Sequence, residues 1–305
     1  MKKIYFIANL LAGRATINSC LGEIIRELNK ADYEVTVRIT MSGTDACEQS
    51  AYACANGYDM IVCAGGDGTL SQCVQGIMNS ERIIPVGYIP AGSTNDFART
   101  LGIPKEPMEA VSHILKGRAV PCDIGKFNDS YFTYVTAFGA FTNVTYETSQ
   151  QVKNVLGHSA YVLSGLAQLT SIRSKRMRIE YDGNVIEDEF IFGMVTNSSS
   201  VAGLLSLNDF YLDDGVFEVT LIKKPTNIVH LHEILSSLLN ITEEIDKEYI
   251  RFFRTNEIRF TSLNNEPITW TIDGEYGGDL PVNTISCIQR ALPIYVKSKE
   301  HKMQM

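Results

Sequence analysis

The sequence predicts an N-terminal α/β domain built on a parallel sheet, followed by a C-terminal antiparallel, mostly β domain that we expect to be a β-sandwich. Up to about Pro121, short apolar segments alternate with amphipathic segments, which is typical of repeated βα units. Beyond that point, strand-like segments and tight-turn signals dominate. Two glycine-rich loops each follow an apolar segment of the first part. Because ligands of a parallel sheet bind beyond the carboxyl ends of its strands, these loops mark the expected functional site.

The expected elements of the first domain follow the apolar pattern. Leu21, Ile24, Ile25 and Leu28 recur at helical spacing, and Gly57 closes the next helical segment. In chain order we expect a strand at 4–8, a helix at 17–28, a strand at 33–40, a helix at 44–56, a strand at 59–63, a helix at 70–79 and a strand at 83–89.

The expected elements of the second domain are mainly strands, separated by turn signals such as Asp182-Gly183 and Asp273-Gly274. Helical segments near 144–170 and 226–239 interrupt them. We expect strands at 131–137, 177–181, 185–196, 216–222, 250–253, 257–261, 267–272, 284–289 and 292–296.

Composition indicates a folded protein with reduced cysteines. The chain has 305 residues, of which 45% are hydrophobic, enough for two domains, and its net charge of -8 argues against a nucleic-acid partner. Seven cysteines without a Cys-x-x-Cys pair favour a cytoplasmic protein. Asn9 interrupts the apolar N-terminus, so we interpret this segment as a strand rather than a signal peptide. We see no stretch long enough to span a bilayer, so any membrane contact is expected to be peripheral.

The first glycine-rich loop predicts a phosphate-binding site. It precedes a helix, so its main-chain N–H groups and the unpaired N–H groups of the helix can turn toward an anion. Its residues are Gly65, Gly66, Asp67, Gly68, Thr69, Leu70 and Ser71. We expect Asp67 to help hold Mg²⁺ beside the phosphates. The alternative is an ordinary strand-to-helix turn, which seldom needs three glycines.

The second glycine-rich loop, residues 89–99, predicts a second phosphate contact through Gly92, Ser93 and Asn95. Ser93 and Thr94 are also candidate caps of a helix that starts at Asp96, a role compatible with phosphate binding. Alternatively, Asn95 and Asp96 hold the loop through side-chain to main-chain hydrogen bonds. Two phosphate-type loops at strand ends indicate an enzyme that handles nucleotides.

Four motifs, in this order, resemble the soluble diacylglycerol kinase catalytic-domain family, which includes bacterial lipid kinases and eukaryotic sphingosine kinases. The resemblance covers almost the whole chain. The motifs are Gly65-Gly66-Asp67-Gly68-Thr69, Gly92-Ser93-Thr94-Asn95-Asp96-Phe97-Ala98-Arg99, Tyr211-Leu212-Asp213-Asp214-Gly215-Val216-Phe217 and Ile272-Asp273-Gly274-Glu275. The first motif alone also occurs in NAD kinases; together with the second loop and the late Asp-Gly-Glu it favours the lipid-kinase branch.

The resemblance implies roles for single residues. Glu275 matches the catalytic carboxylate, Asp123 an acid of the active-site network, and Thr40 a threonine that contacts the nucleotide. The metal-binding turn implies the carboxylate of Asp214 and the carbonyl oxygens of Tyr211 and Val216 as Mg²⁺ ligands. The resemblance also implies that Asn9 contacts the nucleotide. There are two departures: residues 9–14 lack the proline that usually follows Asn9, which leaves Asn9 and Gly13 available, and Ser93 replaces a threonine but keeps the hydroxyl.

Glu275 is the expected general base. A carboxylate beside a lipid hydroxyl can accept its proton as the bond to phosphorus forms. The alternative is a type I′ hairpin with a solvated glutamate. For the turn at 211–216, the alternative is an Asp-Asp-Gly β-turn without an ion.

Two basic clusters, residues 173–178 and 251–254, are candidate contacts with an anionic membrane surface. Taken singly, either cluster is better explained as a solvated face or a subunit contact. The resemblance also allows a homodimer through the β domain.

Together with the resemblance, the sequence predicts an ATP- and Mg²⁺-dependent lipid kinase in the cytoplasm and transiently at the membrane, with diacylglycerol as the first choice of acceptor. Monoacylglycerol, phosphatidylglycerol, undecaprenol-like alcohols and sphingoid bases remain alternative acceptors, because each presents a hydroxyl beside an apolar tail. We expect an ATP-binding domain at 1–122, to which 291–305 return, and a lipid- and metal-binding domain at 123–290. The alternatives are an NAD kinase-like enzyme that acts on a soluble nucleotide and a non-catalytic nucleotide or lipid sensor.

Overall fold

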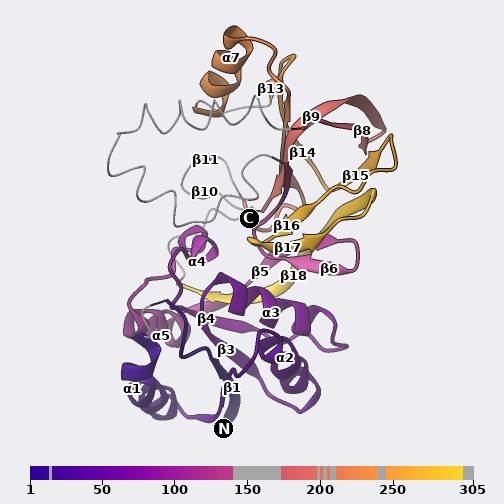
Figure 1. Cartoon of the computed structure of the whole chain (residues 1–305). Helices are drawn as coiled ribbons and strands as arrows, with labels where there is room; N and C mark the ends of the chain where they lie inside the picture. The colour runs from indigo at the N-terminus through magenta and orange to yellow at the C-terminus, as the bar shows by residue number, and fades with distance from the viewer. Residues whose placement is uncertain are drawn as a thin grey trace. The chain divides into compact units, whose positions relative to one another are not determined.

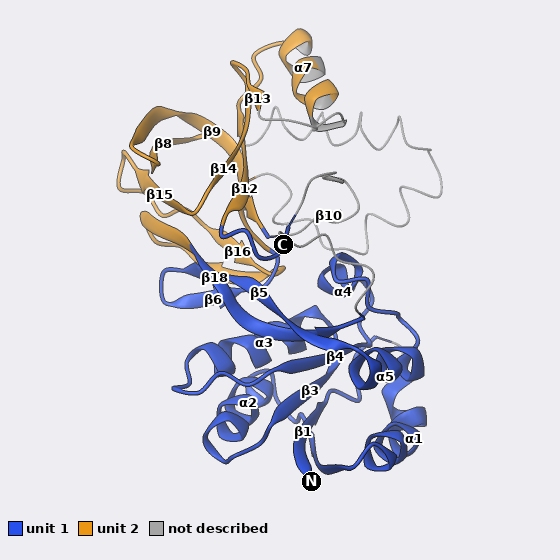
Figure 2. Cartoon of the chain, turned by 180° about the vertical axis from the view of Figure 1, so that it is seen from behind, with its two compact units in different colours: residues 1–134, 197–215, 287–305 blue, residues 135–196, 216–286 orange. Residues whose placement is uncertain are grey.

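The structure, a computed structural model, divides into two compact units (Figures 1 and 2). Unit 1 comprises residues 1–134, 197–215 and 287–305, and unit 2 comprises residues 135–196 and 216–286. The structure describes residues 1–13, 16–139, 173–197, 200–201, 205–206, 211–239 and 245–297. The helix expected near 144–170 lies outside the described residues.

Unit 1 is an α/β unit. Its strands are β1 (Lys2–Ala8), β2 (Tyr33–Ile39), β3 (Met60–Gly65), β4 (Val86–Pro90), β5 (Arg118–Phe127), β6 (Ser130–Phe132), β10 (Ser200–Val201) and β11 (Leu205–Ser206), and its helices are α1 (Thr16–Lys30), α2 (Asp45–Ala55), α3 (Asp67–Met78), α4 (Asp96–Thr100) and α5 (Pro107–Lys116). A long strand, β18 (Val282–Val296), belongs to unit 2 up to Ser286 and to unit 1 from Cys287.

The core of unit 1 is the predicted parallel sheet, with strand order β4-β3-β1-β2. All six residues of β3 are buried, as expected for a strand covered on both faces. Helix α1 packs with α5, and α2 packs with α3, so that helices cover both faces of the sheet (Figure 2). The predicted α/β fold of this half is confirmed.

Three elements of unit 1 differ from the expectation. Helix α3 begins at Asp67 rather than at residue 70, because Gly66 serves as its N-cap and the rest of the glycine-rich loop is helical. Helix α5 and strand β5 were not expected. A signal for α5 was present: Pro107 is a favoured first helical residue, and the Glu106 side chain accepts a hydrogen bond from the Glu109 N–H.

Unit 2 is antiparallel and β-rich, as predicted. Its elements are β7 (Val135–Gly139), β8 (Lys175–Tyr181), β9 (Asn184–Thr196), β12 (Phe217–Lys223), α7 (Ile228–Leu239), β13 (Ile245–Asp246), β14 (Ile250–Thr255), β15 (Glu257–Ser262), β16 (Trp270–Ile272) and β17 (Glu275–Gly278), with the first part of β18. Asp182 and Gly183 both have positive φ (46° and 76°), so the β8–β9 hairpin closes through the predicted two-residue turn. The fully buried Trp270 packs edge-on against Phe138 and Phe260, with ring centroids 4.8 and 5.0 Å away.

The second half also differs from the expectation in places. The strands expected at 284–289 and 292–296 are one strand, β18, which continues through Arg290 although its φ is 53°. The strand expected from Pro267 starts only at Trp270; proline has no N–H to donate to a ladder. The chain passes from one unit to the other after residues 134, 196, 215 and 286. We expected one boundary after residue 122 and a return to the first domain at residue 291.

No helix among the residues that the structure describes is long and apolar enough to span a lipid bilayer.

Two glycines provide a matched test of helix packing in unit 1. A Cβ at Gly76 of α3 would lie 2.1 Å from the carbonyl oxygen of Cys47 in α2, whereas a Cβ at Gly22 of α1 would meet nothing within 4 Å. We expect Gly76→Ala to lower the free energy of unfolding by about 1–3 kcal/mol through overpacking. Gly22→Ala should raise it by about 0.5–1 kcal/mol, because alanine is the better helix former. Urea unfolding of both variants checks this, and a shift of equal sign in both would contradict it.

Candidate functional site

Three loops meet at the carboxyl edge of the parallel sheet in unit 1. They follow β1, β3 and β4, which are neighbours in the sheet (Figure 1). The Ala91 N–H donates to the carbonyl of Gly65 at 2.8 Å, and the Asn9 N–H donates to the carbonyl of Ala64 at 2.8 Å. The sheet register therefore fixes how the two glycine-rich loops and the loop after β1 lie beside one another.

Glycine is required where these loops touch. A Cβ on Gly92 would lie 2.7 Å from Gly66 Cα, and a Cβ on Gly13 would lie 2.2 Å from the carbonyl oxygen of Ala91. A Cβ on Gly65 would lie 2.6 Å from the side chain of Thr69. At Gly92 and Gly13 the loops thus approach main chain to main chain, which a residue with a Cβ would prevent.

The N-terminus of α3 lies at the centre of these loops. No side chain caps its first turn, so the early N–H groups of the helix can donate to an anion. The Asn9 side chain donates to the Thr69 hydroxyl at 3.1 Å and so connects the loop after β1 to the first turn of α3. Leu70 differs from the expectation: its side chain is fully buried and its N–H donates to the Gly66 carbonyl, which makes it a core residue of α3.

Asn95 holds the second loop, as one of the sequence interpretations proposed. Asn95 has a φ of 52°. Its Oδ1 accepts from the Gly92 N–H at 2.9 Å, and its Nδ2 donates to the Gly92 carbonyl at 2.7 Å. Asn95, rather than Ser93 or Thr94, occupies the N-cap position of α4. Ser93 is exposed, so its hydroxyl faces solvent beside the loop.

Asp67 and Asp96 form a crowded carboxylate pair. The Asp96 N–H donates to Asp67 Oδ2 at 3.3 Å, and Asp96 is 1% exposed. Burial, with the Asp96 carboxylate adding to it, raises the pKa of Asp67 to about 6. Among the described residues, Asp67 Oδ1 is buried and has no hydrogen-bond partner. A hard cation coordinated by Asp67 Oδ1 would neutralise this charge, so the arrangement fits the Mg²⁺ that the sequence predicts.

Thr40 lies at the end of β2, next to the first loop. Its N–H donates to the Ala8 carbonyl at 2.9 Å. The loop that follows is folded by Asp45, whose carboxylate accepts from the N–H groups of Met41 and Ser42 and from the Ser42 hydroxyl. Thr40 therefore shares the carboxyl edge of the sheet with Asn9 and the phosphate-type loops.

Asp123 fastens the turn at 213–215, within unit 1. It is fully buried, its Oδ2 accepts from the Gly215 N–H and its Oδ1 from the Arg290 N–H, both at 2.7 Å. Burial raises the pKa of Asp123, although the two N–H bonds act in the opposite direction. The carboxylate thus positions the predicted metal turn; its further place in an active-site network stays a prediction.

The turn contains an acid that sequence reasoning missed. Asp213 is 3% exposed. Its Oδ2 pairs with Arg290 at 3.1 Å, while its buried Oδ1 has no hydrogen-bond partner within the described part of the chain. Asp214, the predicted metal ligand, is only partly buried, as are Tyr211 and Val216. No cluster of three or more His, Cys, Asp and Glu side chains suited to a metal occurs within the described ranges. The predicted site uses one carboxylate and two carbonyls, so it remains a prediction.

Glu275 opens β17 in unit 2, directly after the predicted turn. Asp273 and Gly274 have φ of 48° and 87°, and Ile272 pairs with Glu275 across the hairpin. The buried Asp273 anchors the turn to β7, because its N–H donates to the Val135 carbonyl at 2.8 Å and its Oδ1 accepts from the Val135 N–H at 3.2 Å. Glu275 itself is exposed. A rigid hairpin therefore presents this carboxylate to solvent.

The basic clusters are largely neutralised by ion pairs. Lys175 pairs with Glu266 at 3.3 Å, and Arg178 pairs with Glu180 and Glu187. In the second cluster, Arg251 pairs with Asp246 and Arg254 with Glu218. Arg173 and Arg176 are exposed and take part in no ion pair with the described part of the chain.

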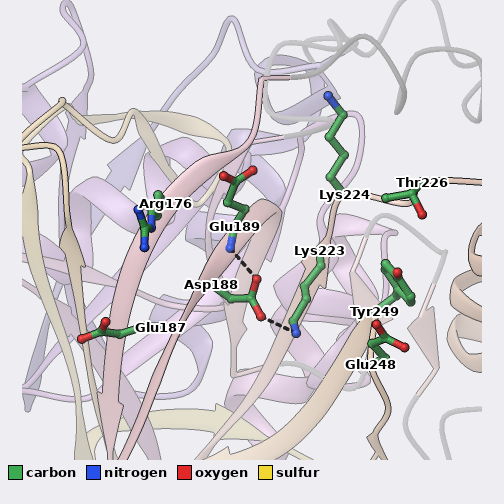
Figure 3. A pocket seen from close by; sticks show the side chains of 9 residues that line it. All are labelled: Arg176, Glu187, Asp188, Glu189, Lys223, Lys224, Thr226, Glu248 and Tyr249. Atoms are coloured by element: carbon green, nitrogen blue, oxygen red, sulfur yellow. Dashed lines mark hydrogen bonds and ion pairs between the residues drawn. The ribbon is translucent and has the colours of Figure 1, made fainter.

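A hollow of about 500 Å³ in unit 2 is lined by none of the predicted catalytic, nucleotide-binding or metal-binding residues, although Arg176 of the first basic cluster is part of its lining (Figure 3). Charged side chains line it, and several are already paired with each other: Lys223 contacts Asp188, whose other oxygen accepts from the Glu189 N–H at 2.8 Å. Its lining residues are Arg176, Glu187, Asp188, Glu189, Lys223, Lys224, Thr226, Glu248 and Tyr249. We interpret it as a solvated polar surface and place the functional site at the loops of unit 1.

Comparison with known families agrees with the two halves of the chain. Residues 3–127 match the family described as "Diacylglycerol kinase catalytic domain". Residues 136–296 match the family described as "YegS C-terminal NAD kinase beta sandwich-like domain". The predicted fold class, including a sandwich-like second domain, is thereby confirmed.

Curated relatives match along nearly the whole chain. The diacylglycerol kinase of Bacillus subtilis (strain 168) is 32% identical over 305 residues, which cover 99% of both chains. The diacylglycerol kinase of Staphylococcus carnosus (strain TM300) is 34% identical and covers 94% of this chain and 93% of its own. A crystal structure from Bacillus anthracis str. Sterne, whose protein is provisionally named a diacylglycerol kinase, superposes with a TM-score of 0.80 at 26% identity, over 97% of this chain and 98% of that one.

The raised pKa of Asp67 predicts how a variant should respond to pH. Above pH 6 the ionised carboxylate destabilises the folded state, and this penalty disappears as the pH falls through 6 toward the unfolded value of 3.8. Asp67→Asn should therefore raise the free energy of unfolding by about 1–3 kcal/mol at pH 7.5 without Mg²⁺, with the gain shrinking to nothing near pH 4. Thermal unfolding across this pH range in EDTA measures it.

The control is Glu34→Gln, which neutralises an exposed carboxylate on β2 of the same unit. It should leave stability nearly unchanged at every pH. A destabilised Asp67→Asn protein at pH 7.5 would contradict the burial penalty.

Proposed function

We propose a specific reaction for this chain from one premise: it belongs to the diacylglycerol kinase catalytic-domain family and is a lipid kinase of that family. The proposed reaction is transfer of the γ-phosphoryl group of ATP, with Mg²⁺, to the hydroxyl of diacylglycerol, which gives phosphatidic acid. The names of the curated relatives support diacylglycerol as the acceptor.

One observation carries the proposal. Two glycine-rich loops pack against each other at the N-terminus of α3, beside the buried carboxylate of Asp67, whose Oδ1 has no hydrogen-bond partner among the described residues. The N–H groups of Gly66 to Thr69 would donate to the phosphates, with Ser93 adding a hydroxyl. Asp67 would hold Mg²⁺, and the ion would neutralise charge that develops on the transferring group. Asn9 and Thr40 would contact the nucleotide from the neighbouring strand ends.

Glu275 is proposed as the general base. The hairpin that carries it is anchored through Asp273, and its exposed carboxylate can accept the proton of the acceptor hydroxyl. Asp123 is proposed as a positioning residue, because its carboxylate is fully buried and fastens the turn that carries Asp213 and Asp214. Catalysis then depends on positioning and charge neutralisation rather than on a covalent intermediate.

The test of the reaction is a lipid panel. Purified protein is incubated with Mg²⁺-ATP and mixed micelles of diacylglycerol, monoacylglycerol, phosphatidylglycerol, a polyprenol and a sphingoid base, and products are read by mass spectrometry. Phosphatidic acid alone supports the proposal. Phosphorylation of another lipid would reassign the acceptor, turnover only with NAD would favour the soluble-nucleotide kinase, and nucleotide binding without turnover would favour a sensor.

Loss of the proposed base should abolish most turnover. We expect Glu275→Gln to lower kcat by about 10²- to 10⁴-fold, the usual contribution of general acid–base catalysis. Its thermal unfolding and its affinity for nucleotide should stay unchanged, because the exposed side chain contributes little to packing. Glu257→Gln, at an exposed glutamate that opens β15 in the same unit, is the matched control. Near-parental turnover of folded Glu275→Gln would remove Glu275 from this role.

The metal turn has its own test. If Asp214 and the carbonyls of Tyr211 and Val216 hold Mg²⁺, Asp214→Ala should reduce bound metal by one equivalent without weakening nucleotide affinity. Asp129→Ala removes an exposed acid of the same unit and should leave the metal content unchanged. Metal analysis of dialysed protein gives the result; equal metal content in the parent and in Asp214→Ala would count against this ligand.

We also propose a peripheral membrane contact, in a cytoplasmic protein, at one edge of unit 2. The Leu263 N–H donates to the Arg176 carbonyl at 3.0 Å and the Ser262 N–H donates to the Pro281 carbonyl at 2.8 Å, so the ends of β8, β15 and β18 lie side by side. Leu263 and Leu280 are 39% and 54% exposed there. Two apolar side chains beside Arg176, with Arg173 three positions earlier in the chain, suit an anionic lipid surface; neither arginine forms an ion pair with the residues that the structure describes.

Charge reversal tests this contact. Arg173→Glu combined with Arg176→Glu should weaken binding to vesicles that contain phosphatidylglycerol by about tenfold or more at low salt, since each basic residue near such a surface contributes about 1 kcal/mol. The effect should fade as salt screens the charges. Lys105→Glu with Arg118→Glu changes the net charge equally at exposed positions of unit 1 and serves as the control. Equal vesicle binding by both double variants would refute the contact.

A further inference from the structure

Tyr88 is a buried polar residue beneath the two glycine-rich loops. It is fully buried on β4, two residues before the strand ends at Pro90. Its hydroxyl lies 3.2 Å from the Gly65 carbonyl oxygen and 3.5 Å from Asn95 Oδ1. One phenolic proton therefore has an acceptor in each of the two loops.

The contacts of Tyr88 continue to the N-terminus of α3. Asn95 holds Gly92 through two hydrogen bonds, at 2.9 and 2.7 Å. Gly92 in turn touches Gly66, where a Cβ built on Gly92 would lie 2.7 Å from the Gly66 Cα. Gly66 is the N-cap of α3. A displacement of Asn95 would therefore move the surface against which the first turn of α3 rests.

Packing alone does not account for the hydroxyl. The ring is enclosed, and phenylalanine would occupy the same space; the oxygen is the only polar atom that tyrosine adds. A buried hydroxyl without an acceptor is unfavourable, so the two acceptors are what allow a hydroxyl at this position. Burial, with the nearby Asp67 carboxylate, raises the pKa of Tyr88, which keeps the phenol protonated as a donor.

We propose that Tyr88 is a positioning residue for the phosphates of the donor nucleotide, acting through Asn95 and Gly92 on the N-terminus of α3. This inference rests on the proposed function, because it presumes that nucleotide phosphates bind at these loops. Tyr88 does not touch the nucleotide; it sets the separation of the loop after β3 and the loop after β4.

The test compares Tyr88→Phe with Tyr58→Phe. Tyr58→Phe also removes one hydroxyl hydrogen bond, from Tyr58 to the Thr36 side chain at 3.1 Å. Tyr58 precedes the amino end of β3, whereas the glycine-rich loops follow the carboxyl ends of the strands, so this variant is the control. Tyr88→Phe should raise the dissociation constant for Mg²⁺-ADP and the KM for ATP about 3- to 10-fold, the effect of one net hydrogen bond. The KM for the lipid acceptor should stay within twofold of the parent. Tyr58→Phe should change none of these constants by more than twofold.

A second background identifies the route of the effect. Asn95→Gly keeps a residue suited to positive φ but removes the amide that receives the Tyr88 proton. If Tyr88 acts through Asn95, adding Tyr88→Phe to Asn95→Gly should weaken nucleotide binding by less than twofold further. A full additional 3- to 10-fold loss would overturn this route.

The inference fails if Tyr88→Phe binds Mg²⁺-ADP within twofold of the parent, or if it weakens acceptor and nucleotide alike. Hydrogen exchange of residues 91–95 without nucleotide gives an independent readout, and it should be faster in Tyr88→Phe than in the parent or in Tyr58→Phe. If the parent bound no nucleotide, the kinase proposal would fail. Unchanged exchange in Tyr88→Phe would then overturn the loop-ordering role of Tyr88 as well.

Discussion

The contact of Gly66 with Gly92 is the constraint on which the site in unit 1 depends. Each residue follows the carboxyl end of a neighbouring parallel strand, and their main chains lie too close for a Cβ on Gly92. Parallel pairing of β3 with β4 brings the loops to the same edge, and glycine lets them close on one another. The N–H groups of the first turn of α3 are then held beside the second loop by main-chain contacts, which do not depend on side-chain rotamers.

The burial of the Asp67 carboxylate has an electrostatic cost in the folded chain. A carboxylate with a buried, unpartnered oxygen next to Asp96 has a pKa of about 6, so its negative charge is disfavoured in the folded chain. A bound cation would remove that penalty. If Asp67 binds Mg²⁺ as proposed, fold stability and metal binding are coupled through this one residue, which combines burial with a neighbouring like charge.

The turn at 213–215 follows a different principle. Asp123 is also buried, but both of its oxygens accept main-chain N–H groups, from Gly215 and Arg290. These bonds join residues that are 92 and 167 positions away in the sequence. Both carboxylate oxygens of Asp123 are thus engaged in holding the fold, whereas Asp67 Oδ1 has no hydrogen-bond partner among the described residues.

The sequence by itself determined the strand periodicity, the hairpin turn at Asp273-Gly274 and the two glycine-rich loops, because these follow from local rules of apolar spacing and positive φ. It also indicated the family, through motifs that are contiguous in the chain. Only the tertiary structure decided that Asn95 rather than Ser93 is the N-cap of α4, that Leu70 is a core residue, that Asp213 pairs with Arg290, and that the Tyr88 hydroxyl hydrogen-bonds to the glycine-rich loops. These roles depend on partners distant in sequence or on burial, and neither quantity has a local signature along the chain.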